Sequence, residues 1–392
     1  MRRKQIFYRI VDNKQRLITG LSFNKIADLL ISAKTTLTAL MLAAGVPAWM
    51  ISWLVPIRES GALLPQALLS IYLSQKPYRH KVWRIGMFVQ LFSITAVLIS
   101  FYFSSGITTG VLVLSFLATL SLGRSICSLT LKDIAADVAA KGERGKLLGK
   151  AATISGVCTL LIALPLVSFD EKLDQLAITM MLAISILCFA FTLIWMWPLK
   201  TEVEIAEKSA FKLQADKDVI KFILVRGLFV HSALVAPYFM LEKQSEASDL
   251  LPIYIASEAL AALISSYIWG NISDKSAKLT LQLAGSLAFI ACAGLLFIDS
   301  PSLWISAGLF FVLSVAHTGV RSGRKTYSLD VKSGQKRTEL VGFSNTAIGF
   351  ILLAFGAIYA LLTPMLPFSV VYVMTAMLLL ATLSTLFLTN EK

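Results

Sequence analysis

Residues 250–278, LLPIYIASEALAALISSYIWGNISDKSAK, decide the fold because residues 54–82, LVPIRESGALLPQALLSIYLSQKPYRHKV, repeat their landmarks 196 positions earlier. At this shift the landmark pairs are Leu54 and Leu250, Pro56 and Pro252, Ile57 and Ile253, Ser74 and Gly270, and Arg79 and Lys275. Further pairs keep the same order at shifts of 197 and 193: Arg124 and Arg321, Asp133 and Asp330, and Arg144 and Arg337. The sequence therefore predicts an internal duplication within its 392 residues.

Composition indicates that the chain lies mainly in lipid. Hydrophobic residues make up 56% of it and charged residues only 15%. Apolar runs of about 20 residues, the length that crosses a hydrocarbon core, fall near 27–50, 55–74, 83–104, 109–131, 147–168, 176–197, 218–241, 250–270, 279–298, 302–320, 340–363 and 367–389. We predict an all-α integral membrane protein of twelve transmembrane helices in two six-helix repeats, 1–198 and 218–392, joined by a cytoplasmic linker, 199–217.

The placement of positive charge gives the topology. The net charge is +13, and thirty of the 36 lysines and arginines lie in segments on the side of the N-terminus. Only Lys172 and Lys243 lie on the opposite side. By the positive-inside rule both termini are cytoplasmic, and the basic surplus does not call for a nucleic-acid partner. Four cysteines without paired spacing give no sign of a disulfide framework or a metal site, and no cofactor is expected.

A short loop resembles the signature of the major facilitator superfamily, Gly-x-x-x-Asp-Arg/Lys-x-Gly-Arg/Lys. Residues 270–278, GNISDKSAK, keep Gly270, Asp274, Lys275 and Lys278 of that pattern. The copy at residues 74–82 has lost its aspartate to Tyr78. The resemblance implies a secondary transporter whose halves rock about a central site, with the loop joining them on the cytoplasmic side. It also implies that Asp274 pairs with Arg321.

A second stretch resembles a bacterial branch of the superfamily that is labelled only as permeases. It comprises residues 56–66, PIRESGALLPQ, together with Lys132-Asp133 and Arg144-Gly145. This resemblance implies the bacterial inner membrane as the location and supplies no substrate. We expect a monomer in the lipid bilayer.

Ionisable residues within the spans are the candidate site, because each costs roughly 2.5 to 3.5 kcal/mol at the bilayer centre and needs a partner, water or a purpose. The resemblance implies that spans one, four, seven and ten line a central cavity, and these spans contain Lys34, Arg124, Arg226, His231 and His317. This basic set favours an anionic or zwitterionic substrate. The alternatives are hydrogen-bonded core histidines, and arginines that pair near the cytoplasmic ends.

Two carboxylates are candidates for proton coupling, Glu59 and Glu258. Glu59 shares a helical face with Gln66, and we expect a bend at Pro65. A desolvated carboxylate can carry a proton. The alternative is that Arg58 neutralises Glu59 at the membrane surface.

Repeated charges on the cytoplasmic side are candidate gate contacts, with Asp133 beside Arg144 and Asp330 beside Arg337. The alternative is solvated loop charge, which contributes little to stability.

The predicted function is secondary active transport of a small solute by alternating access, with protons as a possible second partner. The sequence contains no phosphate-binding Gly-x-x-x-x-Gly-Lys-Ser/Thr loop and no His-Glu-x-x-His motif, so we do not expect an enzyme. The alternatives are proton-coupled efflux of amphipathic compounds and a membrane sensor or scaffold that does not transport. Lys34, His231 and His317 facing a cavity would favour transport, whereas a filled apolar centre would favour the scaffold.

Overall fold

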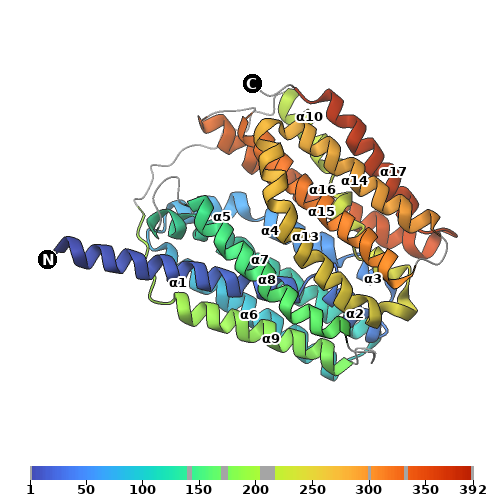
Figure 1. Ribbon diagram of the computed structural model, residues 1–392, viewed down its shortest axis with the longest axis horizontal. Coiled ribbons are helices and arrows are strands. Elements are labelled where there is room, and N and C mark those ends of the chain that lie inside the picture. The colour runs from blue at the N-terminus through green and yellow to red at the C-terminus, as the bar shows by residue number, and fades with distance from the viewer. Residues whose placement is uncertain are drawn as a thin grey trace.

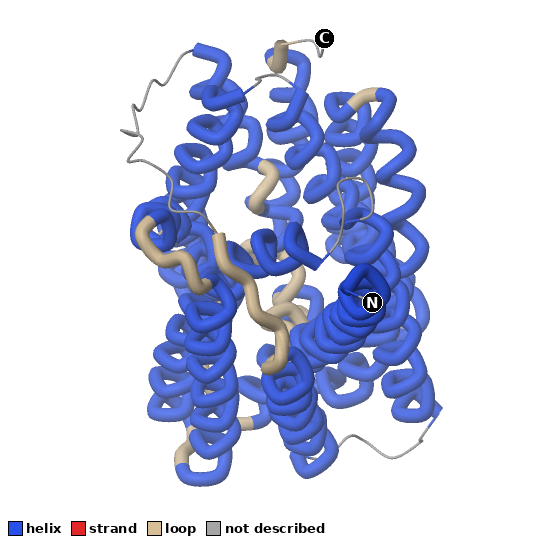
Figure 2. The backbone as a smooth tube through the Cα atoms, turned by 90° about the vertical axis from the view of Figure 1, so that its left-hand side faces the viewer, coloured by secondary structure: helices blue, strands red, loops and turns tan. Residues whose placement is uncertain are grey.

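The computed structural model describes residues 2–138, 144–168, 175–203, 217–298, 302–330 and 334–389. Within these ranges the chain forms helices and loops and no strand (Figure 2). The helices are α1 Arg2–Leu30, α2 Thr36–Ala43, α3 Ala48–Ile51, α4 Leu54–Leu63, α5 Gln66–Ser74, α6 Arg79–Phe103, α7 Gly106–Val138, α8 Arg144–Ser168, α9 Gln175–Met196, α10 Lys217–Leu228, α11 His231–Leu234, α12 Tyr238–Leu241, α13 Ala247–Lys275, α14 Ala277–Phe297, α15 Leu303–Asp330, α16 Gly334–Met365 and α17 Val371–Ser384. Two 3-10 turns, η1 Gln244–Glu246 and η2 Thr385–Phe387, complete the order.

Nine helical segments within the described ranges are long and apolar enough to cross a membrane. They correspond to predicted spans three to eleven, with α10, α11 and α12 together forming the seventh. The first predicted span is divided among α1, α2 and α3, the second between α4 and α5, and the last is the shorter α17 with η2. An all-helical membrane protein is therefore confirmed, whereas the number of twelve spans and the two repeats stay predictions.

The bend expected at Pro65 is present. Helix α4 ends at Leu63 and α5 begins at Gln66, so the proline stands between the two helices. Proline has no amide hydrogen to donate to the preceding turn and its ring clashes with that turn's carbonyl. The position of this break could therefore be predicted from the proline in the sequence.

Two further breaks lie at corresponding places in the two parts of the chain. The first separates Leu30 of α1 from Thr36 of α2, and the second separates Leu228 of α10 from His231 of α11. The residues before the breaks are 198 positions apart and those after them 195, close to the 196-residue shift. Neither 31–35 nor 229–230 contains proline or glycine. Non-helical backbone at membrane depth is tolerated where it is buried in protein or lines a water-filled cavity.

The helices form two groups that meet along two seams (Figure 1). In the first group α1 packs on α8 and α9, and α7 on α4 and α6; in the second, α15 packs on α13 and α14. The seams are α8 against α13 and α4 against α16. At the latter seam a Cβ on Gly356 would lie 2.7 Å from the Pro56 Cβ, and one on Gly349 would lie 2.5 Å from the Leu64 Cγ. Small residues thus let α16 approach α4 closely, as membrane helices commonly do.

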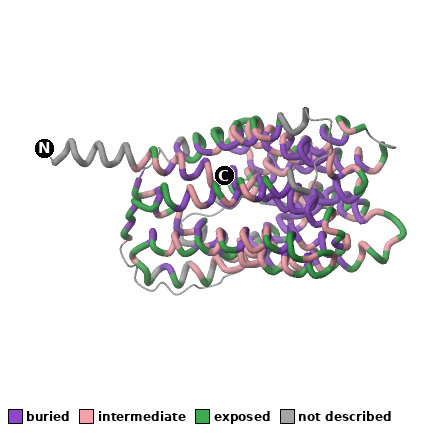
Figure 3. Tube along the Cα trace, turned by 90° about the horizontal axis from the view of Figure 1, so that it is seen from below, coloured by how far each residue is buried: buried purple, intermediate pink, exposed green. Residues whose placement is uncertain are grey.

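The two ends of the bundle differ in how they are closed. We call the end that holds residues 75–79, 197–203 and 276 the basic end, and the opposite end the far end. At the far end Tyr238 donates a hydrogen bond of 2.7 Å to the Ser52 hydroxyl, which joins the two groups of helices. Buried positions gather toward this end, opposite the N-terminus (Figure 3). The described part of α15 packs on helices of its own group and forms no substantial seam with the first group. The structure is therefore closed at the far end.

Candidate functional site

The first helix break is held by Arg58 of α4. Its guanidinium Nη1 donates to the Ile31 carbonyl at 2.7 Å, and Nη2 donates to the Asp28 carbonyl at 3.2 Å. The last carbonyls of a helix have no partner within it, so Arg58 supplies the hydrogen bonds that the end of α1 lacks. Arg58 is buried, with 7% of the residue exposed. These contacts direct Arg58 to α1 and not to neutralisation of Glu59.

Asp28 links Arg58 to α7. Its Oδ1 atom lies 3.3 Å from Arg58 Nη2 and 3.3 Å from Arg124 Nη1. One carboxylate therefore faces two guanidinium groups, which leaves the trio with a net positive charge. The Arg124 side chain keeps 35% of its surface exposed, so this charge remains accessible.

Lys34 lies within the first break and reaches the other group of helices. Its Nζ atom is 3.9 Å from Glu258 Oε1 on α13. The Ser32 hydroxyl donates to Glu258 Oε2 at 3.1 Å. Lys34 and Glu258 expose only 17% and 18% of their side chains. The break in the first span is thus joined directly to the second group.

Glu59 is half-buried and takes part in no hydrogen bond or ion pair with the residues that the structure describes. Its carboxylate lies in the electrostatic field of Arg124, Lys34, Arg321 and Arg324. These cations come from α7, the first break and α15. Glu59 therefore lies in a strongly positive electrostatic environment.

Helix α15 contributes a polar stripe. His317, Arg321 and Arg324 follow spacings of four and three residues, which place them on one face of a helix. His317 Nδ1 lies 3.1 Å from the Ser232 hydroxyl. Among the described residues neither arginine has a hydrogen bond or ion pair, and Arg321 is exposed while Arg324 is half-buried. Arg324 was not among the residues predicted from the sequence, although its spacing from His317 and Arg321 was the signal that could have identified it.

Positive charge dominates this site, which we call the central cluster. Its members are the cations Lys25, Lys34, Arg58, Arg124, Arg321 and Arg324 and the carboxylates Asp28, Glu59 and Glu258. Six cations thus face three carboxylates. An arrangement with this excess attracts anions.

His231 forms a neutral core contact at the second break. It is fully buried, with Nδ1 2.7 Å from the Leu228 carbonyl and Nε2 2.6 Å from the Tyr359 hydroxyl. Because a carbonyl only accepts, Nδ1 carries the proton and Nε2 accepts from Tyr359. Both ring nitrogens are thereby satisfied within the protein, as in the alternative of a hydrogen-bonded core histidine.

Arg226 lies elsewhere on the wall of the second group. Its guanidinium donates to Ser344 Oγ at 2.8 Å and to Asn345 Oδ1 at 2.7 Å. Asn345 in turn donates to Gln66 Oε1 at 3.0 Å across the seam of α5 and α16. Arg226 therefore takes part in a contact between the two groups of helices. It lies five residues before His231 in the sequence and on a different helix face.

The signature loop does not form the ion pair that was expected of its Asp274. Asp274 is exposed and forms no ion pair with Arg321 within the described part of the chain, so that expectation is wrong. Instead Arg79 Nε lies 3.1 Å from Asp133 Oδ2, a charge contact without hydrogen-bond alignment. Lys278 donates to the Leu388 carbonyl at 3.1 Å.

The structure describes fewer contacts for the other gate candidates. Lys275 is exposed, and a Cβ added to Gly270 would meet no atom within 4 Å. The side chains of Arg144, Asp330 and Arg337 lie outside the described residues, so their expected pairings with Asp133 and with each other stay predictions.

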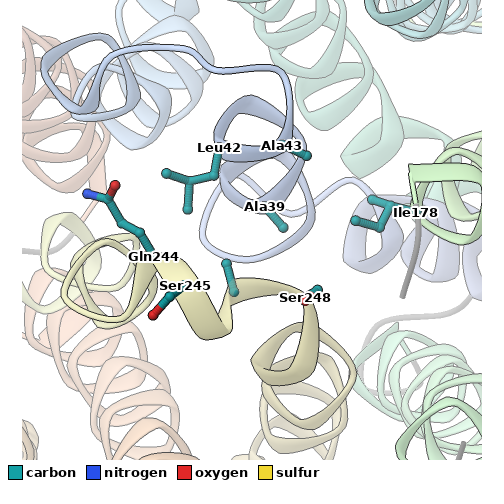
Figure 4. A pocket seen from close by; sticks show the side chains of 8 residues that line it. Ala39, Leu42, Ala43, Ile178, Gln244, Ser245 and Ser248 are labelled. Atoms are coloured by element: carbon teal, nitrogen blue, oxygen red, sulfur yellow. The ribbon is translucent and has the colours of Figure 1, made fainter. Parts of the chain in front are cut away.

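A cavity of about 430 Å³ opens at the far end (Figure 4). It lies where the first group meets the second, and none of its lining residues is charged: Ala39, Leu42, Ala43, Ile178, Gln244, Ser245, Ala247 and Ser248. Its chemistry is distinct from that of the central cluster. Within the described ranges no three His, Cys, Asp or Glu side chains are grouped so as to hold a metal ion.

The sequence matches no protein-family model and no curated protein. Its structure is similar over nearly the full length of solved transporters. One, titled a bacterial homologue of the iron transporter ferroportin in an outward-facing state with soaked iron, is 15% identical with a TM-score of 0.59 over 96% of this chain and 98% of that one. The chain has the fold of the major facilitator transporters. That fold is the one that the resemblance of the signature loop implied.

Two further transporters of this fold superpose more closely. A D-xylose-proton symporter is 13% identical with a TM-score of 0.68, covering 98% of each chain. A POT family transporter in complex with 5-aminolevulinic acid is 9% identical with a TM-score of 0.72, over 95% of this chain and 94% of that one. The structural similarity establishes the major facilitator fold. At identities this low it says nothing about which substrate this chain binds.

Proposed function

We propose that this protein is a secondary active transporter that moves a small solute bearing a carboxylate or another oxyanion, anionic or zwitterionic, by alternating access. The major facilitator fold supports the transport class. The central cluster supports the chemistry of the solute, since six cations face three carboxylates there. A charged centre does not favour the alternative of a scaffold with a filled apolar core.

One observation carries the proposal: Arg321 and Arg324, on one face of α15, form no hydrogen bond or ion pair among the described residues, and both interact electrostatically with Glu59. Arg324 is half-buried, and taking a charge out of water is unfavourable unless an opposite charge compensates for it. A ligand that brings a negative charge to α15 provides that compensation. Guanidinium groups also match the planar, two-oxygen geometry of carboxylates and phosphates.

The proposal includes an orientation and a conformation. Two six-helix halves, 1–198 and 218–392, rock about the central cluster, joined by the linker 199–217. Both termini and the basic end lie in the cytoplasm of a bacterium, and the protein acts as a monomer in the inner membrane. The closed far end and the exposed Arg321 then describe a state open to the cytoplasm.

Counterflow in proteoliposomes tests the proposal. Purified protein is reconstituted, and uptake of a radiolabelled oxyanion mixture of small carboxylates and amino acids is measured against the same unlabelled solutes inside. We expect the wild type to exchange at least one of them, and Lys34→Ala and Arg324→Gln to lose that exchange. Lys221→Gln, which removes an exposed cation of α10 outside the central cluster, is the matched control. Exchange at the wild-type rate in both variants would remove these residues from the site.

Proton coupling has a specific support in Glu258. This carboxylate contacts Lys34 and Ser32 across the two groups of helices. Its protonation would abolish the negative charge that faces Lys34, so the proton and the contact between the groups are linked. In this proposal Glu258 is the coupling residue, whether the protein imports or exports its substrate.

A further inference from the structure

We propose that Glu59 binds the ammonium group of a zwitterionic substrate whose oxyanion is bound by Arg321 and Arg324. This inference rests on the proposed transport function and narrows its substrate class. It assigns opposite charges of one small molecule to two walls of the same site: α4 in the first group of helices and α15 in the second.

The charges that the protein leaves without contacts define the ligand. Asp28 is bound by Arg58 and Arg124, and Glu258 is bound by Lys34 and Ser32. Glu59 is the carboxylate of the central cluster that no described residue contacts, although four cations surround it at longer range. An ionised carboxylate has about four acceptor positions. In Glu59 these positions are open to a donor from outside the protein.

The neighbouring arginine does not fill those positions. Arg58 follows directly before Glu59 in the sequence, yet its guanidinium donates to Ile31 and Asp28 of α1. Because those contacts hold the end of α1, Arg58 cannot turn to Glu59 without leaving buried carbonyls unsatisfied. The half-buried carboxylate therefore keeps its full charge for a ligand.

The opposite wall requires a negative charge. Arg321 and Arg324 lie on one face of α15 and have no protein partner within the described chain. Both are close enough to Glu59 to interact with it electrostatically. Two guanidinium groups suit an oxyanion, which accepts parallel hydrogen bonds from them, and one carboxylate suits an ammonium group, which donates three. The ligand class that provides a contact for all three groups is an amino acid or an aminophosphonate.

Matched pairs of probes test the assignment in the intact protein. We measure the thermal stabilisation of purified protein by ω-amino acids and by carboxylates of the same chain length: glycine and acetate, 4-aminobutyrate and butyrate, 6-aminohexanoate and hexanoate. The expected result is that one amino acid binds at least about tenfold more tightly than its carboxylate, as a charge-assisted contact implies. Glu59→Gln should abolish this difference and retain the binding of the carboxylate.

Controls keep the outcomes separate. Glu246→Gln removes a surface carboxylate near the far end and should preserve the difference between the paired probes. Glu59→Asp keeps the charge and should retain part of it, which guards against a general failure of the Gln variant to fold. Equal binding of both probes at every length, or a difference that persists in Glu59→Gln, overturns the inference. If carboxylates bind through Arg324 in that case, the proposed transport function stands; if no probe binds, both fall.

A proton-carrying role for Glu59 gives a different pattern. In that case Glu59→Gln loses accumulation driven by a pH gradient, retains exchange, and discriminates between the paired probes as the wild type does. This pattern would also overturn the inference.

Discussion

The two helix breaks lie at corresponding places in the chain and have opposite chemistry. Arg58, Asp28, Lys34 and Glu258 surround the first break, and each carries a charge. At the second, His231 bonds the Leu228 carbonyl and Tyr359 with neutral groups. In the proposed function the first break binds the substrate and couples its transport to protons, and the second, with its neutral contacts, serves as a pivot. Non-helical segments near the membrane midplane are where transporters of this kind place their substrate and ion sites.

The largest expected effect is the loss of Arg58. Arg58→Gln removes the charge that faces Asp28 and leaves the end of α1 with carbonyls that lack partners. Asp28 keeps its contact with Arg124, so we expect a loss of about 2 to 4 kcal/mol in the free energy of unfolding, mainly from the two carbonyls, each of which costs about 1 to 3 kcal/mol when left unsatisfied. Denaturant unfolding in detergent measures it, with Lys275→Gln as the control. A loss below about 1 kcal/mol would show that the first break does not depend on charge.

Replacing Glu258 should separate coupling from exchange. Glu258→Gln cannot lose a proton, so accumulation driven by a pH gradient should fall to the level of empty liposomes while counterflow persists. Because Glu258 and Lys34 are only partly buried, we expect a modest cost in stability of about 1 kcal/mol. Accumulation that remains intact in this variant would exclude Glu258 as the coupling residue.

The neutral pivot should tolerate change better than the charged break. Tyr359→Phe deletes the hydroxyl that donates to His231 Nε2, and we expect a loss of about 1 to 2 kcal/mol in unfolding free energy. Since no charge is involved, the loss should be the same at low and high salt. A strong salt dependence would indicate that His231 is charged, contrary to its hydrogen bonds.

The smallest effect is expected at the signature loop. A Cβ on Gly270 meets open space and the backbone there is helical. Gly270→Ala should therefore stabilise the protein slightly, by about 0.5 to 1 kcal/mol, through the better helix propensity of alanine. Counterflow should be unchanged. A marked loss of transport would show that another conformation brings a neighbour against Gly270.

Much of the architecture could be predicted because it depends on local rules. Apolar runs mark spans, and Pro65 marks a break. The first break could not be predicted, because residues 31–35 contain no proline or glycine and the bond that permits it comes from Arg58, 27 positions away from Ile31. Tertiary hydrogen bonds override local propensity there. The pairing of Asp274 with Arg321 was wrong for a related reason, since a family pattern gives the residue types and the packing of α13 against α15 gives their contacts.

The candidate site divides in the same way. Lys34, Arg124, Glu59 and Glu258 were identifiable because charge within an apolar span is costly. Their pairing was not, because it joins residues far apart in the sequence, as in the contact of Lys34 with Glu258, which are 224 positions apart. Histidine is a residue type that often occurs in functional sites, but His231 is a buried core residue. Only its two hydrogen bonds reveal this.

The hydrogen bond that joins the two helix groups at the far end depends on a single donor. Ser52 donates to the Ala48 carbonyl and Thr363 donates to the Tyr359 carbonyl, so the Tyr238 hydroxyl supplies the proton that crosses between the helix groups. A neutral hydrogen bond of this kind contributes only about 1 kcal/mol, and water replaces it when it breaks. This part of the closure therefore acts as a weak latch. In the proposed transport cycle, a ligand needs only a small difference in affinity between the two states to release this hydrogen bond.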